Sequence, residues 1–296
     1  VALFGIISNI INIVVFYQEG LKSTVNISLT GLALSDLGCL LLVQWYNICF
    51  NPLFAGSGIP LVLFEFQHLT AGVPHLCFTR VTGWITVYIT AERCLCIVTP
   101  LKVKRLLSPA RSVLIICSIY ALTALTLLPE YKSMYIDWKF YPGSNRTLLG
   151  LIQKANVQHL NGLTSLLYGL QMIFIFVAVG VLTAVLVIKL KLHSVWRNKS
   201  VSNSDQSCAM SSKDKKIMSV IITIAVFMII LYTPSVIFTA YAFIEPEFSI
   251  GGRLANVYLA AASFLVLLEV INSSYTIVLY YFMSSNFRKR FVQLFQ

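Results

Sequence analysis

The stretch Leu160–Ile188 (LNGLTSLLYGLQMIFIFVAVGVLTAVLVI) contains no charged residue. An α-helix rises about 1.5 Å per residue, and about 20 apolar residues cross a bilayer core about 30 Å thick. This stretch is therefore long enough to cross a membrane. Val113–Pro129 and Ile217–Phe243 are also free of charge, so these windows alone predict three membrane-spanning helices.

The overall composition is that of a membrane protein. The chain is 57% hydrophobic and 11% charged, whereas soluble domains carry roughly 25% charged residues. A net charge of +11 is also typical of proteins that bind nucleic acid. In a chain with a membrane composition, the excess of Lys and Arg indicates instead how the protein is oriented in the membrane. The seven cysteines form no CxxC pair and no zinc-type spacing, which favours packing residues or free thiols.

Three further apolar windows are interrupted by isolated ionisable residues: Asp36 in one, Arg80 and Glu92 in the second, and Glu269 in the third. A shorter window opens the chain without an initiator Met, so we expect the natural N-terminus to precede Val1. The predicted spans cover residues 1–17, 24–48, 68–98, 113–129, 160–188, 217–243 and 254–283. We predict an all-α membrane protein, a single seven-transmembrane helix bundle over 1–296. It ends in a short amphipathic surface helix over 286–296 whose apolar face borders three basic residues.

The distribution of basic residues predicts the orientation. Sixteen Lys and Arg residues fall on one side of the predicted spans and five on the other, which places the richer side in the cytoplasm. With seven spans, the N-terminus is then extracellular and the protein is expected in the plasma membrane. The sequon Asn145-Arg146-Thr147 falls in an outer loop, so Asn145 is a predicted glycosylation site.

The motifs within the spans resemble those of rhodopsin-like (class A) G-protein-coupled receptors along the whole chain. Ser8-Asn9 is similar to the family's Gly-Asn signature, and LALSDL (Leu32–Leu37) to its second-span motif. Glu92-Arg93-Cys94 resembles Asp/Glu-Arg-Tyr, with Pro100-Leu101 at the expected offset. LYTP (Leu231–Pro234) lies where the family has Cys-Trp-x-Pro. Asn272–Arg288 resembles the family's NSxxNPxxY motif with a following Phe-Arg, although its Asn-Pro is replaced. Within the family, the likeness is best to molluscan chemosensory and invertebrate peptide receptors.

Several positions depart from that pattern. The third-span position that usually carries a disulfide is His68, and the loop Glu130–His159 contains no cysteine, so no bridge is expected. The fourth span lacks its usual Trp and the fifth its usual Pro. Tyr232 replaces the Trp that the family moves on activation.

The resemblance implies an activation switch at the inner end of the bundle. Arg93 is expected to bridge its neighbour Glu92 and Asp214, which precedes the sixth span, until that helix swings outward and admits a heterotrimeric G protein. Charge-assisted hydrogen bonds are worth about 1.5–3 kcal/mol, enough to bias such an equilibrium. A surface ion pair worth little is the alternative. Pro234, Tyr232 and Tyr280 complete the expected switch.

A polar pocket is expected near the middle of the membrane. It comprises Asn9, Asp36, Thr82, Asn272, Ser273 and Thr276. Such oxygen ligands suit a sodium ion, but Thr276 replaces the family's Asn, which favours a plain water-filled network over ion binding. No other cofactor and no metal ligand set is predicted.

The agonist, an extracellular peptide or small chemosensory molecule, is expected to contact four residues in the outer half of the bundle: His75, Arg80, Tyr232 and Glu269. Helical geometry turns Arg80 away from Thr82, so a structural hydrogen bond to Gln171 or a fourth-helix carbonyl is the competing role.

Other classes of membrane protein fit less well. No lysine lies between Lys216 and Lys289, which excludes a retinal Schiff base in the seventh span. No GxSxG or HExxH motif is present, so an enzyme is not predicted. A multi-span transporter is the alternative, although no inverted repeat is visible. The expected partners are thus a G protein, an agonist and membrane lipids.

Overall fold

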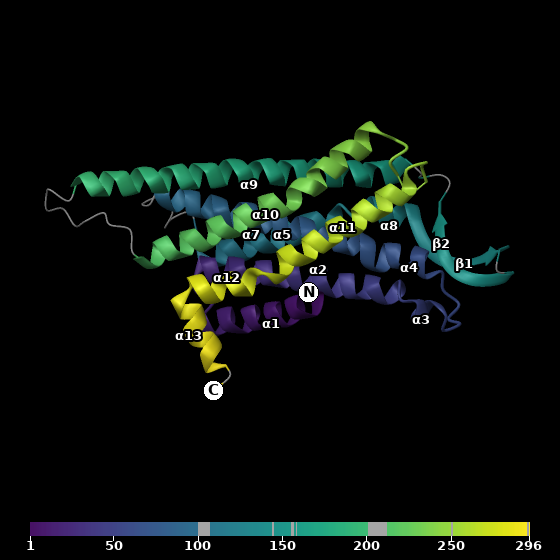
Figure 1. Cartoon of the computed structure of the whole chain (residues 1–296), viewed down its shortest axis with the longest axis horizontal. Coiled ribbons are helices and arrows are strands. Elements are labelled where there is room, and N and C mark those ends of the chain that lie inside the picture. The colour runs from purple at the N-terminus through teal and green to yellow at the C-terminus, as the bar shows by residue number, and fades with distance from the viewer. Residues whose placement is uncertain are drawn as a thin grey trace.

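The computed structural model describes residues 1–99, 107–143, 145–154, 157, 159–200, 212–249, 251–294 and 296. Within them, seven helical segments are long and apolar enough to cross a membrane. This confirms the predicted seven-helix bundle. Figure 1 shows the helices running along the long axis, with a β-hairpin at one end and the C-terminal helix at the other.

Several of the spans are built from more than one helical element. The first two are α1 (Ala2–Glu19) and α2 (Thr24–Cys49); α4 (Leu63–Gln67), the π-helical turn η1 (His68–Gly72) and α5 (Val73–Val98) form the third; α7 (Pro109–Leu125) and α8 (Leu128–Ser133) the fourth; α9 (His159–Ser200) the fifth; α10 (Ser212–Ile244) the sixth; α11 (Ala255–Ser274) and α12 (Thr276–Met283) the seventh. The remaining elements are α3 (Pro52–Ala55), strands β1 (Met134–Tyr141) and β2 (Arg146–Gln153), and α13 (Ser285–Gln293).

Some helices extend past the apolar windows that predicted them. The third span begins at Leu63 rather than His68, and the fourth continues through α8 to Ser133. Both extensions carry a carboxylate, Glu65 in α4 and Glu130 in α8. A charged residue ends an apolar window, but it does not end a helix when its side chain finds a partner.

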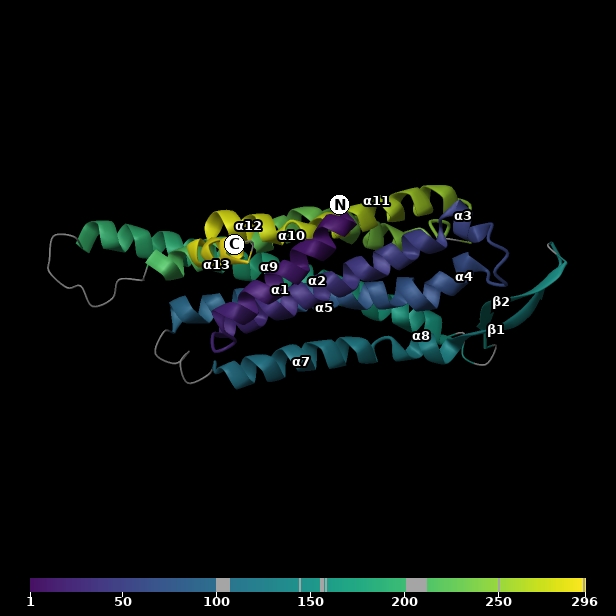
Figure 2. The same cartoon turned by 90° about the horizontal axis from the view of Figure 1, so that it is seen from below.

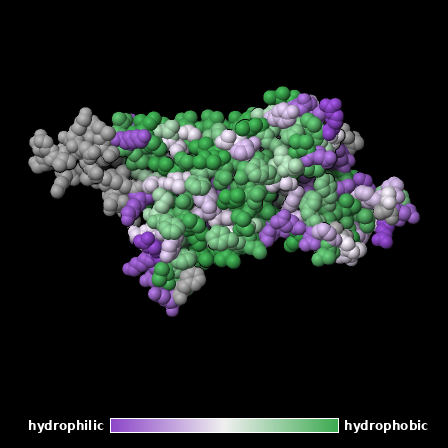
Figure 3. Space-filling model, in the orientation of Figure 1, coloured by the Kyte–Doolittle hydropathy of each residue, from purple (hydrophilic) through white to green (hydrophobic). Residues whose placement is uncertain are grey.

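The lipid-facing and core-facing sides of the spans are both apolar. On α9, Phe174 and Val181 are more than half exposed, whereas Ile175 and Val179 are buried against α5 and α10. Figure 3 shows hydrophobic side chains covering the middle of the visible face and hydrophilic ones gathered toward its two ends. Lipid therefore replaces water as the solvent for the exposed apolar side chains, and hydrophobic periodicity carries little information about the core.

The C-terminal helix turns away from the bundle axis at Ser284, whose hydroxyl accepts a hydrogen bond from the N–H of Phe287. Phe287 is 1% exposed, and its ring lies 5.6 Å from Phe16 and 5.4 Å from Tyr280. Figure 2 shows α13 lying beside the end of α12. One aromatic side chain thus pins the amphipathic helix to α1 and α12.

Helix α1 approaches α11 closely at a glycine. A Cβ built on Gly5 would touch the Ser274 side chain and lie 2.7 Å from Leu40 Cδ1. The neighbouring Asn9 side chain reaches across the same contact to the Ser273 carbonyl at 2.7 Å. Any larger side chain at Gly5 must push α1 away from the bundle and lengthen that hydrogen bond.

We expect Gly5→Ala to lower the stability of the purified protein by about 1–3 kcal/mol, the usual cost of overpacking. Gly180→Ala is the matched control, because a Cβ there has no atom within 4 Å. Thermal unfolding in detergent measures both variants. Equal melting of Gly5→Ala and Gly180→Ala would show that α1 and α11 are not packed as described.

Candidate functional site

The Glu92–Arg93 pair lies buried at the inner end of α5. Arg93 Nη2 donates a hydrogen bond to Glu92 Oε1 at 2.6 Å. Glu92 is 2% exposed and Arg93 is 8% exposed. The Thr24 hydroxyl, at the start of α2, donates to the same carboxylate oxygen. The burial argues against the alternative that the two residues form a weak surface ion pair, since little solvent reaches either charge.

The described hydrogen bonds of the Glu92–Arg93 pair tie α5 to α2. Asp214 lies in the first turns of α10, but its side chain falls outside the part of the chain that the structure describes, as do Pro100 and Leu101. Thr24 was not predicted as part of the switch. Nothing in its sequence context distinguishes it from other threonines at a helix start, and only the packing of α2 on α5 places it beside Glu92.

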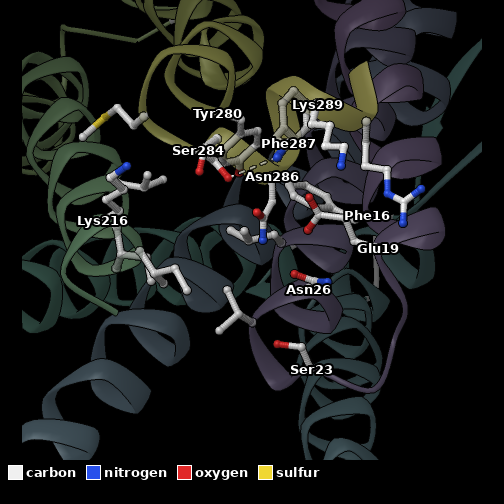
Figure 4. Close-up of a pocket in the computed structure, with 18 of the residues that line it drawn as sticks. Phe16, Glu19, Ser23, Asn26, Lys216, Tyr280, Ser284, Asn286, Phe287 and Lys289 are labelled. Atoms are coloured by element: carbon white, nitrogen blue, oxygen red, sulfur yellow. Dashed lines mark hydrogen bonds between the residues drawn. The ribbon is translucent and has the colours of Figure 1, made fainter. Parts of the chain in front are cut away.

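An inner cleft of about 630 Å³ opens next to this end of the bundle. Its walls come from α1, α2, α10, α12 and α13. Figure 4 shows Lys216 on one side, Phe16 and Glu19 on the other, and Tyr280 beside Phe287 at the back. Tyr280, which was expected to belong to the switch, lies on the wall of this cleft and is 2% exposed.

The predicted polar pocket gathers around Asp36 at mid-membrane depth. Thr82 and Ser273 each donate a hydroxyl hydrogen bond to Asp36 Oδ1 at 3.0 Å. Ser35, which was not predicted, lies 2.9 Å from the Thr82 hydroxyl. One carboxylate oxygen therefore joins α2, α5 and α11.

A second set of bonds extends this network to α1. The Asn9 amide donates to the Ser273 carbonyl, and the Asn12 amide donates to the Thr276 hydroxyl at 3.2 Å. Asn272 is buried beside them, with Oδ1 unpartnered among the described residues. The structure thus brings together the predicted pocket residues and adds Asn12 and Ser35.

The four predicted agonist residues are all buried in the outer half. His75 Nε2 lies 3.7 Å from Glu269 Oε2, so α5 and α11 meet there through an acid and an imidazole. Tyr232, in α10, is 4% exposed and packs with Met172 and Met228.

Arg80 does not take the structural role that was weighed for it. Gln171 accepts instead from the Trp84 indole at 3.3 Å, and Arg80 Nη2 contacts the Met172 sulfur at 3.5 Å. Arg80 is 6% exposed. It faces α9 and lies within electrostatic range of both His75 and Glu269.

The second outer loop forms the β1–β2 hairpin, which packs against α4 and α8 and projects from the outer end of the bundle (Figure 1). Glu65 Oε2 in α4 accepts hydrogen bonds from the Tyr141 hydroxyl at 2.6 Å and from the Leu151 N–H at 2.7 Å. Backbone bonds of Leu149 with Pro60 and Val62 add the first outer loop to the edge of β2.

A further contact joins η1 to α8 at His68, the position where the family usually carries a disulfide. His68 Nε2 lies 3.0 Å from Glu130 Oε1, and the Tyr131 hydroxyl donates to the Leu69 carbonyl at 2.8 Å. The six described cysteines are free thiols. These contacts were not predicted, because residues 62 positions apart in sequence carry no local signal of their pairing.

Asn145 occupies the tip of the hairpin. It is exposed, and its backbone is left-handed with φ of 49°, a conformation that Asn adopts more readily than most residues. Its side chain is therefore open to solvent, as a glycosylation site requires.

The comparison with known families now has a structural setting. Residues 1–296 match the family described as serpentine type 7TM GPCR chemoreceptor Srw. The chain belongs to this family. No curated protein matches it. The Srw family is one of multi-pass receptors that signal through G proteins, which fits the seven spans and replaces the transporter alternative. As a class of chemoreceptors it is not a class of enzymes.

The hairpin anchor of this Srw receptor predicts a pH effect. Partial burial and the hydrogen bond to the Glu65 carboxylate raise the pKa of Tyr141 from 10.0 to about 12. A group whose pKa is raised in the folded state contributes stability below its unfolded pKa and loses it as pH rises. We expect hairpin docking to be intact below pH 10 and to weaken between pH 10 and about 12.

Tyrosine-selective NMR, assigned with Tyr141→Phe, measures this titration. Glu65→Gln should bring the Tyr141 pKa closer to its usual value, because the negative charge beside the phenol is removed. Glu130→Gln serves as the control, since Glu130 contacts His68 instead. If both variants shift the titration equally, Glu65 is not the cause.

Proposed function

We propose that this Srw-family chain is a plasma-membrane chemoreceptor with an extracellular N-terminus. It binds a small molecule or peptide in the outer half and activates a heterotrimeric G protein when the inner end of α10 moves outward. The observation that carries the proposal is the buried Thr24–Glu92–Arg93 contact beside the 630 Å³ cleft. The excess of basic residues at the inner end supports the orientation.

The contact works as a latch for the resting state. Buried, charge-assisted hydrogen bonds are worth about 1.5–3 kcal/mol each. Breaking the hydrogen bond between Arg93 and Glu92 frees Arg93 to turn toward the cleft. A helix that a G protein inserts there would present the backbone carbonyls of its C-terminal end to the Arg93 charge. Agonist binding in the outer half shifts the same equilibrium only if the agonist prefers the open state.

The mid-membrane oxygens can serve the same transition. Asp36 Oδ1 and the hydroxyls of Thr82, Ser273 and Ser35 form a set of hard ligands suited to a sodium ion. In that role these residues would hold the cation and balance the Asp36 charge. A network of water molecules bound to the same oxygen atoms is the alternative to a sodium ion in this pocket.

We expect Thr24→Val to raise basal G-protein activation by about 10- to 100-fold, because the loss of one hydrogen bond to a carboxylate shifts the equilibrium by about 1.5–3 kcal/mol. Thr30→Val is the control, since the Thr30 hydroxyl donates to the carbonyl of Asn26 within its own helix. Engineered G-protein probes of each class, recruited to the receptor at matched surface expression, measure the effect.

Arg93→Ala should abolish recruitment, and Asp214→Ala should raise it. Unchanged recruitment in Thr24→Val and Arg93→Ala for every G-protein class would overturn the latch. In that case substrate flux across vesicles would be the next measurement.

A further inference from the structure

Arg80 is a buried charge that forms no salt bridge with a carboxylate of the described residues. The residue is 6% exposed, its Nε has no hydrogen-bond partner among those residues, and its Nη2 contacts the Met172 sulfur at 3.5 Å. Among the described residues, the salt bridges formed by carboxylates involve His68, His75 and Arg93. A thioether sulfur is a weak acceptor, so the guanidinium is poorly satisfied.

Such an arrangement costs stability and needs a reason. A guanidinium stays protonated under all ordinary conditions, so Arg80 cannot escape the cost of burial by losing its charge. Within a membrane span, ionisable residues are expensive and usually functional. An apolar residue of similar length would fill the same volume without the penalty.

One acid lies within electrostatic range of Arg80 but forms no salt bridge with it. This acid is Glu269, whose Oε2 faces His75 Nε2 at 3.7 Å. The guanidinium therefore keeps several N–H donors in a fixed planar fork. That fork matches the two oxygens of a carboxylate, with which Arg forms paired hydrogen bonds.

The walls around Arg80 are apolar and adaptable. A cavity of about 10 Å³, enough for one water molecule, lies against Arg80 between α5, α9 and α10. Met172, Met228, Phe176 and Val236 line it. Methionine side chains are unbranched and change rotamer easily, so we expect Met172 and Met228 to make room when an apolar body enters.

We propose that Arg80 is the anchor for the carboxylate of a small organic acid whose apolar part packs against Met172, Met228 and Phe176. This assignment rests on the proposed receptor function and names the ligand class for its outer site.

The first test needs no ligand. If Arg80 is held unpaired for a ligand, Arg80→Met removes the penalty and should raise the melting temperature of the purified receptor by about 2–4 °C. Arg93→Met is the control, because it breaks a described ion pair and should lower the melting temperature. A lower melting temperature in Arg80→Met as well would show that Arg80 is structural and would overturn the proposal.

The second test uses matched probes. Sodium salts of the straight-chain acids from propionate to octanoate, and phenylacetate, are compared with their primary amides. We expect at least one acid to raise the melting temperature of the wild type, its amide to have no effect, and Arg80→Met to lose the response. Equal responses to acid and amide, an undiminished response in Arg80→Met, or no response to any acid would each refute it.

The two proposals fail in different ways. Acid binding that depends on Arg80 but never changes G-protein recruitment supports the site and contradicts the receptor mechanism. Recruitment driven by neutral or cationic compounds, and retained in Arg80→Met, supports the receptor and contradicts the carboxylate site.

Discussion

The rest of the bundle depends on how the Asp36 carboxylate is satisfied. Its Oδ1 accepts hydrogen bonds from Thr82 and Ser273, and so fixes α2 against α5 and α11 at once. In a membrane the apolar side chains face lipid and protein with similar free energies, so burial alone does not decide which faces of the helices meet. Polar groups do decide it, because each one left unpaired in hydrocarbon is costly.

The same rule organises both ends of the molecule. At the inner end, Thr24 and Arg93 share the Glu92 carboxylate. At the outer end, Glu65 holds Tyr141 and the backbone of Leu151. Three carboxylates at three depths, Asp36, Glu92 and Glu65, thus set the arrangement of the helices and hold the β1–β2 hairpin. Arg80 departs from this pattern, since its charge has no such partner within the described ranges.

Much of the architecture could be predicted because it depends on length and composition. Uncharged windows such as Leu160–Ile188 locate spans directly, and the motif order brought Asp36, Thr82 and Ser273 into one expected pocket. Contacts that depend on which helix face meets which neighbour could not be predicted. Thr24 beside Glu92 and His68 beside Glu130 are set by packing between distant segments. Arg80 faces α9 as its turn away from Thr82 implied, but its contact there could not be predicted, because Gln171 accepts from Trp84 and leaves Arg80 against Met172.

The attachment of the hairpin has a consequence for how the receptor is made. The loop Glu130–His159 contains no cysteine, and Glu65, Tyr141 and the His68–Glu130 pair hold it in place through oxygen and nitrogen atoms. A loop held by a disulfide needs an oxidising compartment and can be released by reductants. The attachment of this hairpin to α4 and α8 needs neither an oxidant nor an isomerase, so it can form and dissociate reversibly. Its strength depends on the pH and salt of the surrounding water rather than on the redox state.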